Sequence, residues 1–170
     1  MSDANLYRRL ATDFVAGATA FELVDGSVLS FADVERASAK AASALRGLGL
    51  APGDRVTVIA EKSPAYLWVF LGCLRAGLVF HPLNPSYTAR EIEFFVDNAG
   101  SAALIHDPAL ADRVAAAGAD AAQPPVRLTL DPSGGGSFAA LFDEADDGFE
   151  SVPRSTDDMA ALLYSSGTTG

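Results

Sequence analysis

The middle of the sequence alternates short apolar runs with longer runs of helical character. The apolar runs are 55–60, 78–80 and 102–106, which are too short for helices and read as strands. Helical segments at 64–76 and 89–98 separate these runs. Strands that alternate with helices predict a mainly parallel sheet, and right-handed crossovers place the helices on the sheet faces. The fold class predicted from this pattern is therefore α/β.

Local capping residues mark the ends of these helices. Ser63 precedes Pro64, a favourable residue at the first helical position, and Gly77 follows the last apolar turn. Thr88 and Glu91 have the spacing of a capping box. Both predicted helices thus have a sequence signal at their start.

The first fifty residues predict three further elements. A short helix is expected at 6–14, and a small antiparallel ribbon at 20–24 and 27–29 with Asp25-Gly26 as a two-residue turn. A longer helix follows, with a Ser30/Asp33 capping box at its start and apolar residues at helical spacing as far as Gly47 and Gly49.

A short helix is expected at 109–117, and the composition changes after it. The segment 118–137 is rich in Ala, Pro and Gly and predicts a surface connection, interrupted only by the strand-like run 126–130. We expect 134–136, which is Gly-Gly-Gly, and the acidic stretch 143–158 to be mobile and solvated.

Composition excludes several classes of function. The formal net charge is −10 and the pI is about 4.4, which argues against binding nucleic acid or an anionic membrane through a general basic patch. The most apolar stretch, 66–80, is shorter than a bilayer span and contains Arg75. Cys73 is the only cysteine, and the N-terminus lacks a signal-peptide pattern, so the expected location is the cytoplasm.

The last twelve residues carry the strongest functional signal. An apolar run at 159–164, expected to be an edge strand, leads into a sequence of small and hydroxyl-bearing residues. Hydroxyl groups donate to phosphate oxygens, and glycines let backbone N–H groups converge on an anion. The candidate phosphate-binding residues are Ser165, Ser166, Gly167, Thr168, Thr169 and Gly170. Composition alone would favour a flexible tail, and the spacing is not that of a Walker P-loop.

Other reactive side chains are interpreted as structural. His81 and His106 stand alone, without neighbours at metal-ligand spacing, and Cys73 lies in an apolar helical stretch. Phe94 and Phe95 are expected to pack the helix that Thr88 caps. No catalytic residue and no metal ligand is predicted in this sequence.

Three segments in order resemble the adenylate-forming superfamily, which includes acyl-CoA synthetases, peptide-synthetase adenylation domains and firefly-type luciferases. They are 29–34 (LSFADV), 74–85 (LRAGLVFHPLNP) and 164–170 (YSSGTTG), the last being the most specific because it is similar to the opening of the family's phosphate loop. The continuation 86–95 (SYTAREIEFF) most resembles the malonyl-CoA synthetase branch.

The resemblance implies an acid–thiol ligase that uses ATP, Mg²⁺, coenzyme A and a small carboxylic acid. In such enzymes the carboxylate attacks ATP to give an acyl-adenylate and pyrophosphate, and the thiol then displaces AMP. Residues 1–170 would be an incomplete N-terminal part of the AMP-binding domain, lacking the C-terminal domain, and inactive alone. Two alternatives stay open: a stand-alone nucleotide- or protein-binding module, and an adenylation domain that loads a carrier protein.

Overall fold

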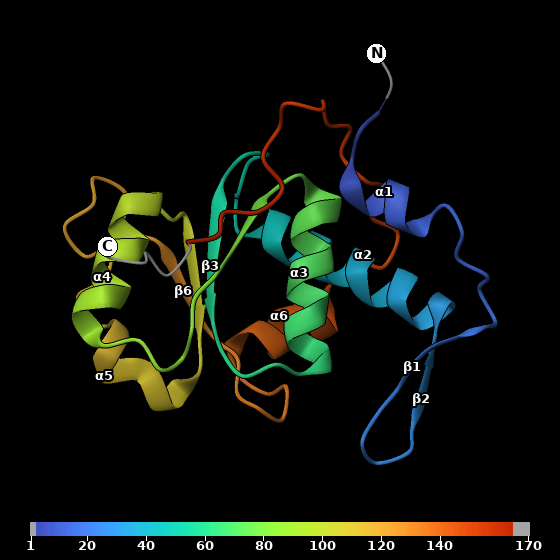
Figure 1. Cartoon of the computed structure of the whole chain (residues 1–170), viewed down its shortest axis with the longest axis horizontal. Helices are drawn as coiled ribbons and strands as arrows, with labels where there is room; N and C mark the ends of the chain where they lie inside the picture. The colour runs from blue at the N-terminus through green and yellow to red at the C-terminus, as the bar shows by residue number, and fades with distance from the viewer. Residues whose placement is uncertain (1–2, 165–170) are drawn as a thin grey trace, which may run out of the picture.

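The computed structural model describes residues 3–164 and has three layers (Figure 1). A parallel sheet of strand order β4-β3-β5-β6 lies in the middle, with α2, α3 and α6 on one face and α4 and α5 on the other. A separate ribbon of β1 and β2 extends beyond α2. The predicted α/β class, with a parallel sheet and a small antiparallel ribbon, is confirmed.

The described elements follow one another in the order expected from the alternating pattern. They are α1 (Leu6–Ala11), β1 (Thr19–Glu22), β2 (Val28–Ser30), α2 (Phe31–Gly47), β3 (Arg55–Ile59), α3 (Pro64–Ala76), β4 (Val79–Pro82), α4 (Ala89–Ala99), β5 (Ala103–His106), the 3₁₀ turn η1 (Pro108–Leu110), α5 (Ala111–Val114), β6 (Val126–Thr129) and α6 (Ser137–Glu144).

The three predicted helix caps form as hydrogen-bonded structures. Ser30 and Thr88 each accept from the backbone N–H three residues on, within complete capping boxes. Ser63 accepts from the backbone N–H of Tyr66 at the start of α3, and Gly77 ends that helix with a left-handed φ of 71°. These caps satisfy backbone groups that a helix end would otherwise leave unpaired.

The sheet is buried on both faces, which explains why its strands are apolar runs without polar alternation. Val56, Val58 and Ile105 face α2 and α3, and Ile59 and Leu104 face α4 and α5. The two helical layers therefore each have their own core cluster. Since the strands are parallel, all four carboxyl ends lie at one edge of the sheet.

Two local predictions need correction. The ribbon turn contains three residues, because the Leu23 N–H bonds to the Ser27 carbonyl and Gly26 adopts a left-handed φ of 82°. The expected strand at 159–164 is a single parallel bridge between Phe80 and Ala161. Only this bridge extends the sheet beyond β4 in the part of the chain that the structure describes.

The expected surface connection contains one strand of the core, and a core helix follows it. As predicted, the run 126–130 contains a strand, β6, which pairs in parallel with β5; Leu128 within the strand and Leu130 directly after it are buried. Helix α6, which the sequence analysis missed, buries Phe138 against the same cluster. The sequence signal for α6 is weak because the helix has only eight residues and no side-chain cap at its start.

The glycine run does not behave as a free linker. Asp131 Oδ1 accepts from Ser133 N at 2.8 Å and from Gly135 N at 2.9 Å, closing a turn. Gly136 has a φ of 113°, and a Cβ there would meet the Thr129 carbonyl oxygen. A close backbone approach therefore explains the glycine at this position.

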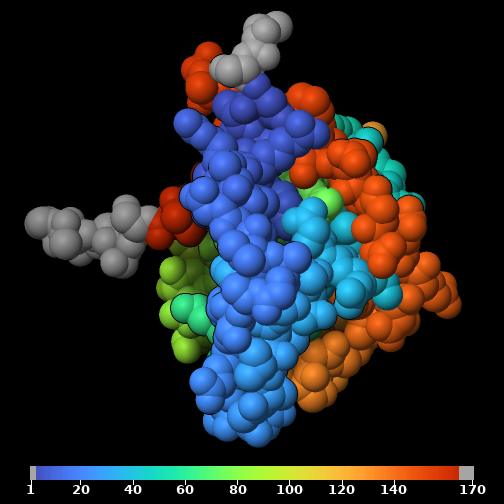
Figure 2. Space-filling view, turned by 90° about the vertical axis from the view of Figure 1, so that its right-hand side faces the viewer, coloured from blue at the N-terminus to red at the C-terminus, as the bar shows by residue number. Residues whose placement is uncertain are grey.

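The acidic segment 143–158 lies along the first fifty residues rather than free in solvent, as Figure 2 shows for the orange and blue parts of the chain. The Ser151 carbonyl accepts from Arg8 NH2 at 2.9 Å, and the Val152 carbonyl accepts from Asn5 Nδ2 at 2.7 Å. Lys40 Nζ donates to the Asp143 carbonyl at 3.0 Å. The acidic side chains at 143, 144, 146 and 147 are exposed, as expected, whereas the backbone at 151–152 packs against the N-terminal part of the chain.

Arg75 is the buried charge that connects these parts. Its NH1 donates to Tyr7 Oη at 3.2 Å and to Ser38 Oγ at 3.0 Å, and lies 2.9 Å from a Glu35 carboxylate oxygen. Its Nε donates to the Phe149 carbonyl at 3.0 Å. Burial, together with the Glu35 hydrogen bond, raises the pKa of Tyr7 to about 12, so the phenol is neutral at ordinary pH. One arginine thus connects α1, α2, α3 and the acidic segment.

Among the described residues, no helix is long and apolar enough to span a bilayer.

Candidate functional site

The six predicted phosphate-binding residues lie outside the described part of the chain, which ends at Tyr164. They are Ser165, Ser166, Gly167, Thr168, Thr169 and Gly170, and they stay a prediction. What the structure does describe is the segment that leads to them. The geometry of this approach is therefore the first part of the site.

The approach segment runs parallel to β4. Phe80 N–H donates to the Ala160 carbonyl at 3.1 Å, and Leu162 N–H donates to the Phe80 carbonyl at 2.9 Å. A segment parallel to β4 leaves the sheet at the edge formed by the carboxyl ends of the strands. Ligands of open α/β sheets bind outside this edge, so the chain reaches residue 165 where a nucleotide site is expected.

Tyr164 is held on the α4 side of the sheet. Its ring centroid lies 4.6 Å from that of Phe95 and 5.4 Å from that of His81, both in tilted arrangements. Its hydroxyl accepts from Asn98 Nδ2 at 2.6 Å. Phe95 therefore packs as expected, whereas Phe94, expected to pack as well, is 59% exposed.

His81 is fully buried beneath Tyr164. Its Nδ1 is 2.8 Å from Thr57 Oγ1, which in turn is 2.5 Å from Ser101 Oγ, and Ser101 donates to the Val96 carbonyl at 3.3 Å. Among the described residues, His81 Nε2 is the buried side-chain atom that has no hydrogen-bond partner. Burial lowers the pKa of His81 to about 4, so the ring is neutral at ordinary pH.

The other two reactive side chains have structural surroundings. Cys73 is completely buried in the core beside α2, and burial raises the pKa of its thiol. His106 is buried at the end of β5, with Nδ1 2.9 Å from the Asp107 carbonyl. Within residues 3–164, no three or more His, Cys, Asp or Glu side chains gather as a metal site.

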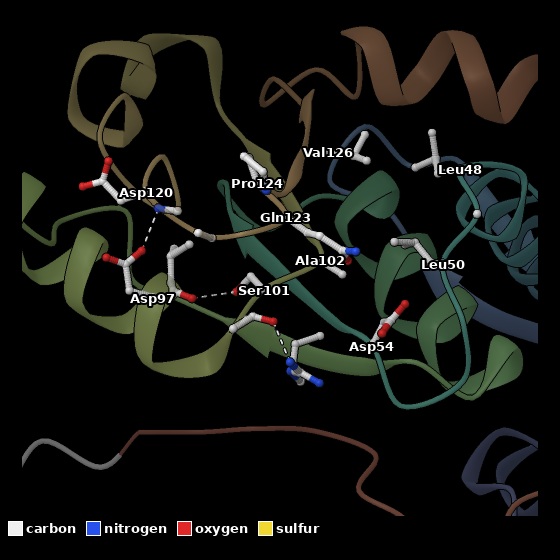
Figure 3. A pocket seen from close by; sticks show the side chains of 16 residues that line it. Leu48, Leu50, Asp54, Asp97, Ser101, Ala102, Asp120, Gln123, Pro124 and Val126 are labelled. Carbon is white, nitrogen blue, oxygen red and sulfur yellow. Dashed lines mark hydrogen bonds between the residues drawn. The ribbon is translucent and has the colours of Figure 1, made fainter.

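A cavity of about 580 Å³ lies at the opposite edge of the sheet, shown in Figure 3. Its wall includes Arg55 and Val126, the first residues of β3 and β6, so it adjoins the amino ends of the strands. Asp54, Asp97 and Asp120 also line it. Three carboxylates repel phosphate, and the Arg55 guanidinium donates to the carbonyls of residues 99 and 100. This cavity is therefore a poor candidate for an ATP site.

The chain belongs to the family of AMP-binding enzymes, whose model matches residues 8–170. It is 37% identical over 145 residues to a feruloyl-CoA synthase of Amycolatopsis, a match that covers 85% of this chain and 27% of that enzyme. A fatty acid–[acyl-carrier-protein] ligase, ScoC of Streptomyces coeruleorubidus, is 32% identical over 87% of this chain and 28% of its own length.

Solved structures agree with this assignment. ATP-bound MatB from Rhodopseudomonas palustris superposes with a TM-score of 0.92 at 36% identity, covering 99% of this chain and 33% of that one. The chain thus spans about a quarter to a third of the length of these three proteins.

Proposed function

We propose that this chain is the N-terminal part of the large domain of an ATP-dependent acyl-CoA synthetase, and that Ser165 to Gly170 bind the ATP phosphates. The family match over residues 8–170 carries this proposal. The approach of the chain to residue 165 at the carboxyl edge of the sheet supports it, because this edge is the usual nucleotide position in open α/β sheets.

The proposed reaction has two steps. A carboxylate attacks the α-phosphorus of ATP, forming an acyl-adenylate and releasing pyrophosphate, and the thiol of coenzyme A then displaces AMP to give a thioester. The departing pyrophosphate gains negative charge, which preoriented N–H and O–H donors of Ser166, Thr168 and Thr169 would stabilise. Mg²⁺ arrives with ATP as part of the substrate.

Malonate is the acid that we propose as substrate. The resemblance of residues 86–95 to malonyl-CoA synthetases favours it. The feruloyl-CoA synthase relative favours an aromatic acid instead. A panel that contains malonate, acetate, ferulate and a long-chain acid separates these choices.

The acyl acceptor has a specific second candidate. ScoC is named as a ligase of an acyl carrier protein, and this chain is 32% identical to it. Thioester formation on coenzyme A supports the synthetase. Thioester formation on a carrier protein, with none on coenzyme A, supports the carrier-loading alternative.

The test of the proposed function uses the full product of the gene that encodes this chain, with ATP, Mg²⁺, coenzyme A and the acid panel. We expect AMP and pyrophosphate as products, and equal amounts of ADP and phosphate would contradict the adenylate mechanism. Binding of ATP without turnover of any acid would favour the stand-alone binding module.

We also propose a cytoplasmic location for the protein. Residues 1–170 alone are proposed to catalyse no ATP–pyrophosphate exchange.

A further inference from the structure

The side chain of Tyr164 is held by three residues that are distant in sequence, namely His81 on β4 and Phe95 and Asn98 on α4. We call these three residues the Tyr164 seat. Two aromatic contacts orient the ring, with centroid distances of 4.6 Å and 5.4 Å, and one hydrogen bond of 2.6 Å fixes the hydroxyl. The backbone is fixed separately by the two hydrogen bonds to Phe80. Tyr164 is therefore restrained through both its backbone approach and its side chain.

A chain of hydrogen bonds orients the imidazole ring of His81 in the Tyr164 seat. Ser101 Oγ donates to the Val96 carbonyl, so it is free to accept from Thr57 Oγ1, which then accepts from His81 Nδ1. This direction satisfies every hydroxyl and places the imidazole proton on Nδ1. The reverse direction would leave a buried Nε2–H donor unpaired. The ring is thus a neutral, oriented surface against which Tyr164 packs.

We propose that the Tyr164 seat positions the phosphate loop, and that Phe95 and Asn98 are positioning residues for ATP binding. The inference rests on the proposed function, since it assigns the loop to ATP. Tyr164 is joined by one peptide bond to Ser165, the first proposed phosphate donor. A hydrogen-bond donor contributes fully only when it is oriented before the ligand arrives. Restraint of Tyr164 therefore lowers the cost of ordering the donors that follow.

If the seat had a purely structural role, its loss would lower the melting temperature and leave the KM for ATP unchanged. Asn98 is exposed and Tyr164 is half-buried, so we expect removal of their mutual hydrogen bond to change global stability little. We expect the same change to weaken ATP binding. The two roles are distinguished by the KM for ATP and the melting temperature, measured on the same variants.

The experiment measures ATP–pyrophosphate exchange by the full gene product, with the acid that the wild-type protein turns over best. Asn98→Ala, Tyr164→Phe and the double variant are compared with Glu93→Ala, a control at an exposed position of the same helix. We expect each single variant to raise the KM for ATP about two- to tenfold, the effect of one lost hydrogen bond. The double variant should be no worse than either single one.

Amide hydrogen exchange provides a readout independent of activity. Peptides covering 160–170 should exchange faster in Asn98→Ala and Tyr164→Phe, while the melting temperatures of both variants stay at the wild-type value. The exchange rate of these peptides in Glu93→Ala should equal that of the wild-type protein. If the wild-type protein is active but the variants show an unchanged KM for ATP and unchanged amide hydrogen exchange, this inference is overturned and the proposed function is not. A wild-type protein without ATP–pyrophosphate exchange would instead overturn the proposed function, and this inference with it.

Discussion

His81 is a titratable residue buried without a charged partner, and its pKa is lowered to about 4 by burial, from 6.5 in the unfolded chain. Between these two values the unfolded state binds more protons than the folded state. The contribution of neutral His81 to the free energy of unfolding is therefore fully present above pH 6.5 and is lost as the pH falls towards 4.

We expect His81→Leu to remove this part of the pH dependence. From pH 7 to pH 5, the wild-type chain should lose at most about 2 kcal/mol of unfolding free energy through His81, and the variant should not. Urea unfolding of both proteins at the two pH values measures the difference. The same loss in both proteins would show that His81 is not protonated on unfolding in this range.

Arg75 is expected to be the most important charged side chain for stability. Arg75→Met removes the donor to the Phe149 carbonyl and to the Ser38 hydroxyl, and the cation beside the Glu35 carboxylate. The unfolding free energy should fall by about 3 kcal/mol, the usual cost when a buried network loses one partner. Arg36→Met is the control, because the Arg36 side chain is 58% exposed and its ion pairs lie at the surface. A loss no larger in Arg75→Met than in Arg36→Met, by denaturant titration, would contradict this interpretation.

At the scale of the elements, the crossing of α2 and α3 depends on Gly72. A Cβ at this position would lie 2.6 Å from Ala41 Cβ and 2.9 Å from the Ala42 nitrogen. Gly72→Ala should therefore cost about 2 kcal/mol of unfolding free energy, although alanine favours helices. Gly47→Ala, in α2 with no atom within 4 Å of its added Cβ, should instead be neutral or stabilising by about 0.5 kcal/mol. Equal thermal stability of the two variants would mean that the helices can separate freely.

The sequence predicted those elements whose signals are local. Ser63, Pro64 and Gly77 lie within or beside α3, so their meaning does not depend on distant residues. The run that forms β6 was predicted to be strand-like and helix α6 was missed, and only their contacts with β5 and α2 show that both belong to the core. Tertiary contacts, rather than local pattern, therefore place β6 and α6 in the core.

The candidate site shows the same limit. The phosphate loop could be proposed from sequence because its hydroxyl and glycine residues are contiguous. The contact of Asn98 with Tyr164 joins positions 66 residues apart, and no local pattern predicts it. His81 was expected to be structural, and its position beneath Tyr164 follows only from the register of β4 with β3 and from the bridge at Phe80.

At the scale of the whole molecule, the two edges of the sheet differ in chemistry. The amino edge carries a cavity with three aspartates, and the carboxyl edge receives the segment that leads to Ser165. These 170 residues carry a net charge of −10, which attracts ATP poorly over long distances. Phosphate binding would therefore depend on local donors, which makes the loop residues sensitive positions for substitution.

ATP–pyrophosphate exchange by the full gene product tests the central claim most directly when Thr168→Ala and Thr169→Ala are compared with Thr156→Ala. Thr156 is a suitable control because it is exposed in the turn at 155–158. Loss of a well-placed donor to a developing charge costs about 100-fold in rate. We predict a loss of about this size in at least one loop variant and near wild-type exchange in the control. Equal exchange in all three variants would contradict the assignment of the loop to the ATP phosphates.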